Sequence, residues 1–396
     1  MQETVPHQLI NHSGELARFC RRASQSRYLA FDTEFISENR YRPKLCLLQV
    51  ATESEYVLID TMAIDSVIPF WDLLVQGDHI TIVHAAREEF LFCFRATGKR
   101  PKKLFDIQMA AAMVGFEYPA AYSNLVGKIL GVSLQKGETR TDWRKRPLSP
   151  AQTEYALQDI VHLIPIYHDL FNRLERLQRS AWLTEEMESW LDSLQEFEIE
   201  PQWHRVPGIS NLSGRALATV RELWIFRDAE ASLRDRSPRR ILPDDLLVEL
   251  ARRGTEDRKK LKAIRGFEHR VSENLVAGLS AAIKRANALP SDQLPTRINR
   301  GKGINLGLLG QFLNTALRII CDQESIAAGV VGTSNDLQEL AAWHLQLVEQ
   351  EPLPLMASGW RAEIIGKTIE EILDGKLAIQ VGNAQSDSPL KILPVK

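Results

Sequence analysis

The fold can be followed from residues 28–35, which read Tyr-Leu-Ala-Phe-Asp32-Thr33-Glu34-Phe. This segment has the apolar and aromatic composition of a β-strand, in which residues two apart point to the same side. Asp32 and Glu34 therefore project together, and burying two like charges is costly unless a cation pairs with them. The oxygen atoms of clustered carboxylates suit a hard divalent ion, Mg²⁺ or Mn²⁺. For these two residues alone, the simpler interpretation is that one carboxylate caps the following segment or pairs with an arginine such as Arg40 or Arg42.

Downstream of this strand the pattern alternates between strands and helices. Residues 45–52 and 56–60 read as two strands joined by a tight polar turn, which should pair antiparallel. Residues 80–84 form a short apolar stretch typical of a buried strand, followed by a helix over 85–96 and a further short strand at 104–106. A meander followed by strands that alternate with helices predicts a mixed sheet with helices on its faces.

A basic loop over residues 137–150 leads into a predicted helix. Ser149 is suited to the N-cap, with Pro150 at the first helical position. Tyr155 and Asp159 stand four apart in this helix and share one of its faces. Such a pair is usually part of a solvated stripe, but here it follows an aromatic and basic loop.

Length and composition indicate a globular protein of several domains. A chain of 396 residues is too long for one ordinary core, and we expect two or three domains. We predict an α/β domain over residues 1–200, a small helical bundle over 210–290, a second helical domain over 300–380 and a disordered tail over 381–396.

Charge and cysteine content exclude several classes of protein. The net charge of −2 gives no global signal for nucleic-acid binding, so any basic surface must be local. The four cysteines lack the close spacing of a zinc site or a disulfide framework and suit a reducing compartment. Residues 1–15 lack the apolar core of a secretory signal, and the apolar stretch 304–320 is interrupted by polar side chains. We therefore expect a cytoplasmic protein with no membrane partner.

These motifs in this order resemble the ribonuclease D family, within the DEDD superfamily of 3′→5′ exonucleases and the subgroup whose last motif carries a tyrosine. The resemblance rests on Asp32-Thr-Glu34, Arg42-Pro-Lys-Leu-Cys-Leu-Leu-Gln49, His84, Leu104-Phe-Asp106, Tyr122-Ser-Asn-Leu, Asp142-Trp143 and Tyr155-x-x-x-Asp159. Residues 217–288 look like a helicase-and-RNase-D C-terminal (HRDC) domain, and 304–379 look like a degenerate second copy. The resemblance implies an α/β ribonuclease-H-like exonuclease domain, a mixed sheet flanked by helices, followed by two all-α HRDC-type domains.

The family resemblance also implies a reaction. It is metal-dependent 3′→5′ hydrolysis of RNA, trimming 3′ ends such as those of tRNA precursors and releasing nucleoside 5′-monophosphates with two divalent cations, Mg²⁺ or Mn²⁺. Asp32, Glu34 and Asp159 would hold the first ion. Asp32 would also bridge to the second ion, which Glu89 would support. Tyr155 would orient the attacking water, completing the expected set of catalytic residues.

One position departs from the family pattern. The family normally places an aspartate five residues after a histidine like His84, and that register falls here on Glu89. The oxygen ligand is kept while the side chain gains a methylene. Two outcomes stay open, a helix shift that absorbs the added length or weaker binding of the second ion.

Local positive charge is concentrated beside the last motif. The residues predicted to contact nucleic acid are Thr33, His84, Arg140, Trp143, Arg144, Lys145 and Arg146. Arginine and lysine bind phosphates without regard to sequence, and an aromatic ring such as Trp143 can stack on an unpaired base. In the helical domain the basic residues fit a binding surface and a solvated face about equally well.

Two rival functions remain open. The same catalytic core could serve a 3′→5′ DNA exonuclease. A non-catalytic nucleic-acid-binding protein would result if Glu89 spoils the metal site. The expected partner is RNA, with tRNA precursors implied by the resemblance, and no obligate protein partner is evident.

Overall fold

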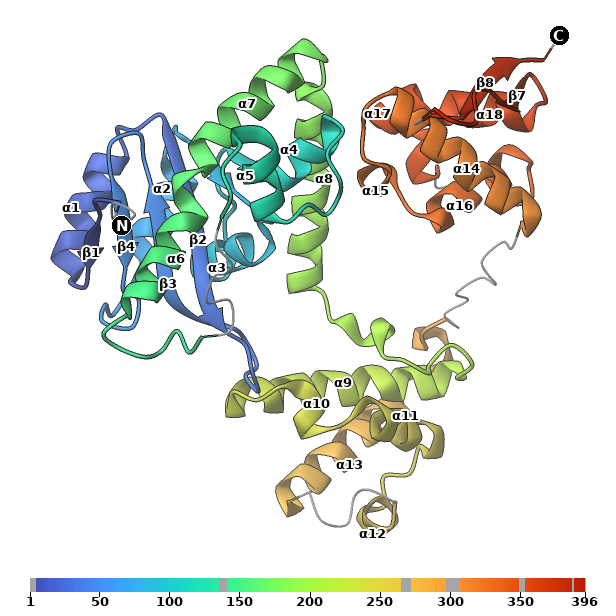
Figure 1. Cartoon of the computed structure of the whole chain (residues 1–396). Helices are drawn as coiled ribbons and strands as arrows, with labels where there is room; N and C mark the ends of the chain where they lie inside the picture. Colours follow the sequence, from blue (N-terminus) through green and yellow to red (C-terminus); the bar gives the residue numbers. More distant parts are fainter. Residues whose placement is uncertain are drawn as a thin grey trace. The chain divides into compact units, whose positions relative to one another are not determined.

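The computed structural model describes residues 5–134, 141–264, 272–296, 306–348, 353–386 and 388–395 (Figure 1). The chain divides into two compact units. The first consists of Met1–Glu34, Leu45–Gln195 and Gly303–Lys396, and the second of Phe35–Lys44 and Glu196–Lys302.

A six-stranded mixed sheet lies at the centre of the first unit, with strand order β1-β4-β3-β2-β5-β6. Its strands are β1 (Gln8–Ile10), β2 (Tyr28–Ile36), β3 (Lys44–Ala51), β4 (Tyr56–Ile59), β5 (Ile80–Val83) and β6 (Leu104–Asp106). The β3–β4 pair is antiparallel, whereas β1–β4, β2–β5 and β5–β6 are parallel. The predicted mixed sheet is confirmed, and the short edge strand β1 is an addition that the sequence pattern did not suggest.

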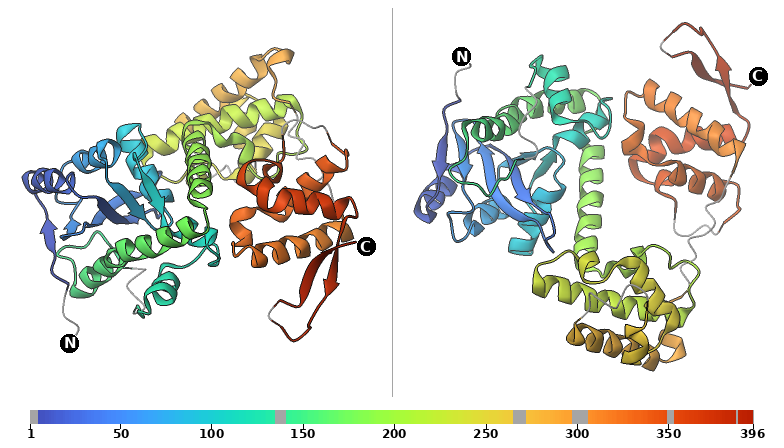
Figure 2. Two further views of the ribbon diagram at one scale, coloured as in Figure 1. Left: turned by 90° about the horizontal axis from the view of Figure 1, so that it is seen from above. Right: turned by 60° about the horizontal axis from the view of Figure 1, so that its bottom comes forward.

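Helices cover both faces of this sheet (Figures 1 and 2). On one face, α1 (Ser13–Ala23), α2 (Ile68–Gln76) and α3 (Arg87–Thr97) enclose a core that includes Leu29 and Phe31 of β2. On the other side, α6 (Pro150–Val161) packs on β4 and α7 (Leu163–Arg176) packs on β5. The remaining helices of the exonuclease-like part are α4 (Ile107–Met113), α5 (Tyr122–Leu130) and the start of α8 (Ser180–Ile199).

The C-terminal region belongs to the same compact unit as the sheet. It contains α14 (Leu308–Gln323), α15 (Ala328–Val331), α16 (Ser334–His344), α17 (Gly359–Arg361), a π-helical turn (Ala362–Gly366), α18 (Lys367–Leu373), β7 (Leu377–Val381) and β8 (Leu390–Pro394). The prediction of a disordered tail over 381–396 was wrong, because β8 pairs antiparallel with β7. Leu390 and Ile392 are the half-buried positions of β8, and this alternation was hidden by the polar residues and prolines around it.

Two buried arginines and two tryptophans join the C-terminal helices to the sheet domain. Arg179, just before α8, is 4% exposed. It donates to the main-chain carbonyl of Met113, at the end of α4, and to that of Ser325, just after α14. Trp182 of α8 stacks on Trp360 of α17 with ring centroids 5.9 Å apart. Arg361 forms an ion pair with Glu186 at 2.6 Å. These contacts are largely buried, and both guanidinium groups are hydrogen-bonded or ion-paired. The C-terminal helices are therefore a fixed part of the unit.

The second unit is a helical bundle. Its helices are α9 (Gly214–Arg234), α10 (Pro238–Ile241), α11 (Asp244–Arg253), α12 (Arg258–Lys262) and α13 (Glu273–Ala288). Leucine, isoleucine and valine side chains from α9, α11 and α13 form its core. The buried Arg227 of α9 ties two helices together through an ion pair with Asp244 at 2.6 Å.

Among the residues with described structure, no helix combines the length and the apolar content that crossing a membrane requires.

Candidate active site

Strand β2 presents Asp32 and Glu34 on the face of the sheet covered by α6 and α7. The ring of Tyr28 lies 5.2 Å from that of Tyr167 on α7, while Leu29 points into the core on the opposite face. Side chains alternate along a strand, so Asp32 and Glu34 share the side of Tyr28. This agrees with the prediction from their spacing of two residues along a strand.

Helix α6 brings Tyr155 and Asp159 to the same place. It begins with a capping box, in which Ser149 Oγ accepts from the Gln152 N–H at 3.1 Å and Gln152 Oε1 accepts from the Ser149 N–H at 3.0 Å. Pro150 follows at the first helical position, as predicted. Tyr155 and Asp159 stand one turn apart on the helix, and burial followed by the charge of Asp159 raises the pKa of Tyr155.

The negative charges of the β2 carboxylates raise the pKa of other carboxylates at this place. Burial, followed by the charges of Asp32 and Glu34, raises the pKa of Asp159 to about 9. Burial and then the charge of Asp32 raise the pKa of Glu34 to about 8. Burial raises the pKa of Asp32 to about 6, against the effect of a hydrogen bond from the Thr33 backbone. Like charges have this effect only at short range, so the three carboxylates converge.

Glu89 completes the group from the first turn of α3. It is 6% exposed and accepts a hydrogen bond from the Thr33 hydroxyl at 2.6 Å. Burial and then the charge of Asp32 raise the pKa of Glu89 to about 8. Asp32, Glu34, Glu89 and Asp159 therefore form one cluster, hereafter the acidic cluster, and the glutamate at the divergent position lies within it.

Asp106 supports α3 at this position, a role that the sequence pattern did not reveal. Its carboxylate accepts the N–H groups of Ala85 at 3.1 Å and Ala86 at 2.9 Å, at the start of α3. It also caps α4 by accepting the Gln108 N–H at 2.8 Å. An aspartate just before a helix is a common N-cap, so the sequence indicated that Asp106 caps α4. Nothing in the sequence indicated its contact with the start of α3.

The acidic cluster has the donor chemistry for a divalent cation. Its donors are all carboxylate oxygens, the type that Mg²⁺ and Mn²⁺ prefer. The Oδ2 atom of Asp159 is buried and has no hydrogen-bond partner, and a cation would lower every raised pKa in the cluster. As the side chains stand, no three His, Cys, Asp or Glu groups in the described ranges surround a common point. The residues fit an ion chemically, and binding one requires their side chains to close around it.

Two of the predicted nucleic-acid contacts are corrected by the structure. Trp143 is 3% exposed and packs against Tyr155 with ring centroids 6.0 Å apart, so its ring is covered and unable to stack on a base. Arg146 forms an ion pair with Asp60 at 2.6 Å and donates to main-chain carbonyls, which leaves no donor for a phosphate. Both residues stabilise the loop from within.

The other predicted contacts differ in how accessible they are. Arg144 and Lys145 are exposed, and Arg144 bonds to Asp142 at 2.8 Å. The Thr33 side chain is buried against Glu89. The Nε2 atom of His84 lies 3.0 Å from the main-chain carbonyl of Ala120. Arg140 lies outside the described residues.

Comparison with known proteins agrees with this site. A family model described as 3′-5′ exonuclease matches residues 7–175, and a model of the HRDC domain matches residues 216–283. The first match contains the entire acidic cluster together with Tyr155. The second covers most of the helical bundle of the second unit.

Two relatives that align over nearly their full length are both named ribonuclease D. Ribonuclease D of Sphingobium indicum is 34% identical over 385 residues, spanning 96% of this chain and 97% of that protein. Ribonuclease D of Zymomonas mobilis is 34% identical over 381 residues, spanning 95% and 96%. The crystal structure of Escherichia coli RNase D, an exoribonuclease involved in structured RNA processing, superimposes with a TM-score of 0.79 at 26% identity, covering 94% of this chain and 99% of that one. The chain therefore belongs to the ribonuclease D family of 3′→5′ exoribonucleases.

Proposed function

We propose that the chain hydrolyses RNA one nucleotide at a time from the 3′ end at the acidic cluster, with two divalent cations, and releases nucleoside 5′-monophosphates. The observation that carries this proposal is a group of four carboxylates whose pKa values are all raised, by burial in each case and also by the charge of Asp32 for Glu34, Glu89 and Asp159. A folded protein keeps such repulsion where a cation compensates for it in the working state. The ions would activate the attacking water and neutralise the negative charge that develops on the phosphate and the leaving oxygen.

The four carboxylates are expected to hold two ions between them. Asp32, Glu34 and Asp159 come from adjacent positions on β2 and α6 and would hold the first ion. Asp32 also lies close to Glu89, as its effect on the pKa of Glu89 indicates. Asp32 would therefore help to hold both ions, and Glu89 would help to hold the second. Thr33 holds the glutamate in place through its hydroxyl.

Tyr155 orients the attacking water through its hydroxyl group. Burial and then the charges of Asp159 and Glu34 raise the pKa of Tyr155, so the phenol keeps its proton at neutral pH. A protonated phenol donates and accepts hydrogen bonds but is a poor base. Its role is therefore positional, and Tyr155 does not take the proton of the water.

The substrate is proposed to be structured RNA, including precursors of tRNA. The exposed Arg144 and Lys145 lie just before α6 and can bind phosphates near the site. In the helical bundle, exposed basic residues of α11 and α12 can add affinity that does not depend on sequence.

Two further parts of the proposal concern organisation and location. We assign the C-terminal helices to a degenerate second HRDC-like domain, because α14, α15 and α16 repeat the long, short and medium lengths of α9, α10 and α11. A cytoplasmic location is supported by the four cysteines, none of which forms a disulfide bond.

The test is hydrolysis of an RNA that carries a 5′ label and a 3′ single-stranded extension. Wild-type protein with Mg²⁺ or Mn²⁺ should shorten it in single-nucleotide steps, and Asp159→Asn should not. A DNA strand of the same sequence distinguishes the rival DNA exonuclease. Calorimetric titration of Mn²⁺ distinguishes the non-catalytic rival, because a protein that takes up no ion at the acidic cluster cannot work as proposed.

A further inference from the structure

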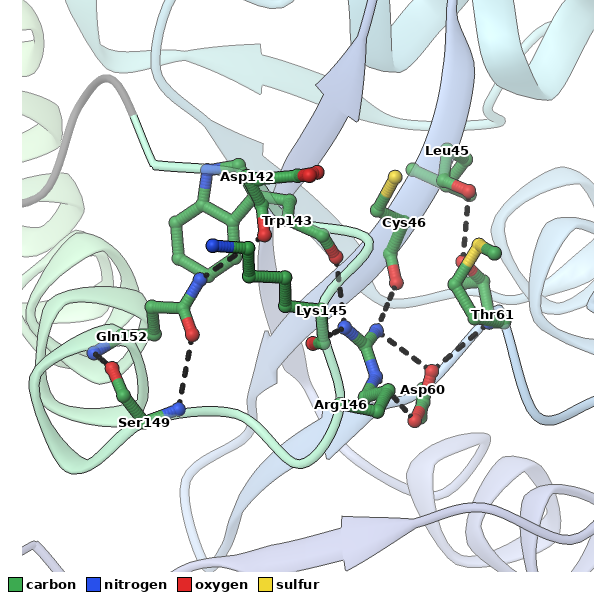
Figure 3. Close-up of polar contacts among 11 residues, drawn as sticks. Leu45, Cys46, Asp60, Thr61, Asp142, Trp143, Lys145, Arg146, Ser149 and Gln152 are labelled. Carbon is green, nitrogen blue, oxygen red and sulfur yellow. Dashed lines mark hydrogen bonds and ion pairs between the residues drawn. The ribbon is translucent and has the colours of Figure 1, made fainter.

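The guanidinium group of Arg146 holds the segment before α6 against the sheet (Figure 3). Nε and Nη2 of Arg146 donate to the two carboxylate oxygens of Asp60 at 2.6 and 2.8 Å. Nη2 also donates to the carbonyl of Cys46, and Nη1 donates to the carbonyls of Trp143 and Lys145, each at 2.8 Å. All five N–H donors of the side chain are therefore used within the protein.

Asp60 is a rigid anchor for this group. It directly follows β4 and is 6% exposed. Its main-chain N–H donates to the carbonyl of Ile10 at 2.8 Å, and its side chain also accepts the Met62 N–H at 3.0 Å. A bidentate pair between arginine and a carboxylate has a defined orientation as well as a favourable energy. The pair thus fixes the loop with respect to the sheet.

The loop is also fixed from its other side. Gln152 of α6 is 4% exposed, and its amide nitrogen donates to Thr141 Oγ1 at 3.1 Å. Trp143 lies between Arg146 and Gln152 (Figure 3). Its ring is buried and tilted by 44° against that of Tyr155. The indole is therefore the surface on which the Tyr155 ring rests.

We propose that the Asp60–Arg146 ion pair is a positioning element for the exonuclease reaction, which acts through Trp143 on Tyr155. By holding the main chain of Trp143, the pair fixes the indole and hence the direction in which the Tyr155 hydroxyl points. This inference rests on the proposed role of Tyr155 in orienting the attacking water. A displacement of about 1 Å at a reacting group can lower a rate on the order of 100-fold.

The test is a double-mutant cycle of Arg146→Lys with Tyr155→Phe, measured on a short single-stranded RNA. Lysine keeps the charge but concentrates its donors on one nitrogen, so it cannot reach Asp60 and all three carbonyls at once. We expect kcat to fall by about 10- to 100-fold, with KM changed much less. In the Tyr155→Phe background, Arg146→Lys should have little further effect, because the Tyr155 hydroxyl that it would displace is already absent.

Arg361→Lys is the matched control. Arg361 is also buried, pairs with Glu186 at 2.6 Å and donates to a main-chain carbonyl, but it lies in α17 of the C-terminal region. Its replacement should lower the melting temperature by a similar amount and leave kcat unchanged. Should Arg146→Lys not fold, Asp60→Asn takes its place in the cycle, because the amide keeps one acceptor for Arg146.

The outcomes separate the positioning role from the proposed reaction. An unchanged kcat in Arg146→Lys, or an equal fall in both backgrounds, overturns the positioning role and leaves the proposed reaction intact. An unchanged kcat in Tyr155→Phe overturns the assignment of Tyr155 and the positioning role with it.

Discussion

Replacing Glu89 by aspartate, the residue that the family normally has there, should lower activity. The Thr33 hydroxyl donates to Glu89 Oε1 at 2.6 Å, so the surrounding backbone is fitted to the longer side chain. Removing one methylene withdraws the carboxylate by about 1.5 Å, which would open this distance from 2.6 Å to about 4 Å if the backbone stays in place. A hydrogen bond to a charged group contributes about 1.5–3 kcal/mol. If that stabilisation is lost in the transition state, the rate falls roughly 10- to 100-fold.

The assay is single-turnover hydrolysis of a labelled RNA at saturating Mg²⁺ and, separately, Mn²⁺. Glu88→Asp is the control, because Glu88 is the neighbouring glutamate, half-buried and paired with Arg87. It should keep a rate near that of the wild type. Glu89→Gln preserves the length and can still accept from Thr33, so it removes only the charge and should be slower with both metals.

Two results would refute this reasoning. A rate for Glu89→Asp at or above that of the wild type would show that α3 can shift freely and that the Thr33 contact has no role in the reaction. An unchanged rate for Glu89→Gln would show that Glu89 is not a metal ligand. The assignment of the second acidic motif would then have to be abandoned.

The remaining predictions concern Tyr155, the response of the acidic cluster to pH and the attachment of the C-terminal helices. Tyr155→Phe should lower kcat less than Asp159→Asn, because it removes one orienting hydroxyl without unseating an ion, and equal losses would contradict this division of roles. The acidic cluster has folded-state pKa values of about 6 to 9, above the usual values of carboxyl groups, so its contribution to the stability of the metal-free protein should be largest below the usual carboxyl pKa and should be lost as the pH rises from there through the folded-state values. Melting temperatures should show this loss, and Mg²⁺ should reverse it. The affinity for Mn²⁺, measured by calorimetry, should rise with pH. A melting temperature and an affinity that do not change with pH would count against the cluster. Trp360→Ala should lower the free energy of unfolding by about 3–5 kcal/mol, because the ring is 1% exposed and stacks on Trp182; a loss below about 1 kcal/mol in chemical denaturation would mean that the C-terminal helices are only loosely attached.

Pairs of residues close in sequence are placed correctly by the local pattern alone. Asp32 and Glu34 share a side of β2 because side chains alternate along a strand. Ser149 and Pro150 start α6 because the cap and the first helical turn have strict local requirements. In each case the geometry depends only on the backbone of one element, so a few residues contain all the information.

Local patterns could not predict contacts between residues that are distant in sequence. Asp60 and Arg146 stand 86 positions apart, and nothing around either one indicates the other. The composition of the loop suggested that Trp143 and Arg146 face the nucleic acid, whereas packing buries the ring and uses every donor of the guanidinium. Whether a basic or aromatic side chain turns outward or inward depends on which partners the closed fold brings within contact distance. That choice is made by the tertiary structure, because burial and hydrogen-bond satisfaction are properties of the whole packed unit and not of a local segment.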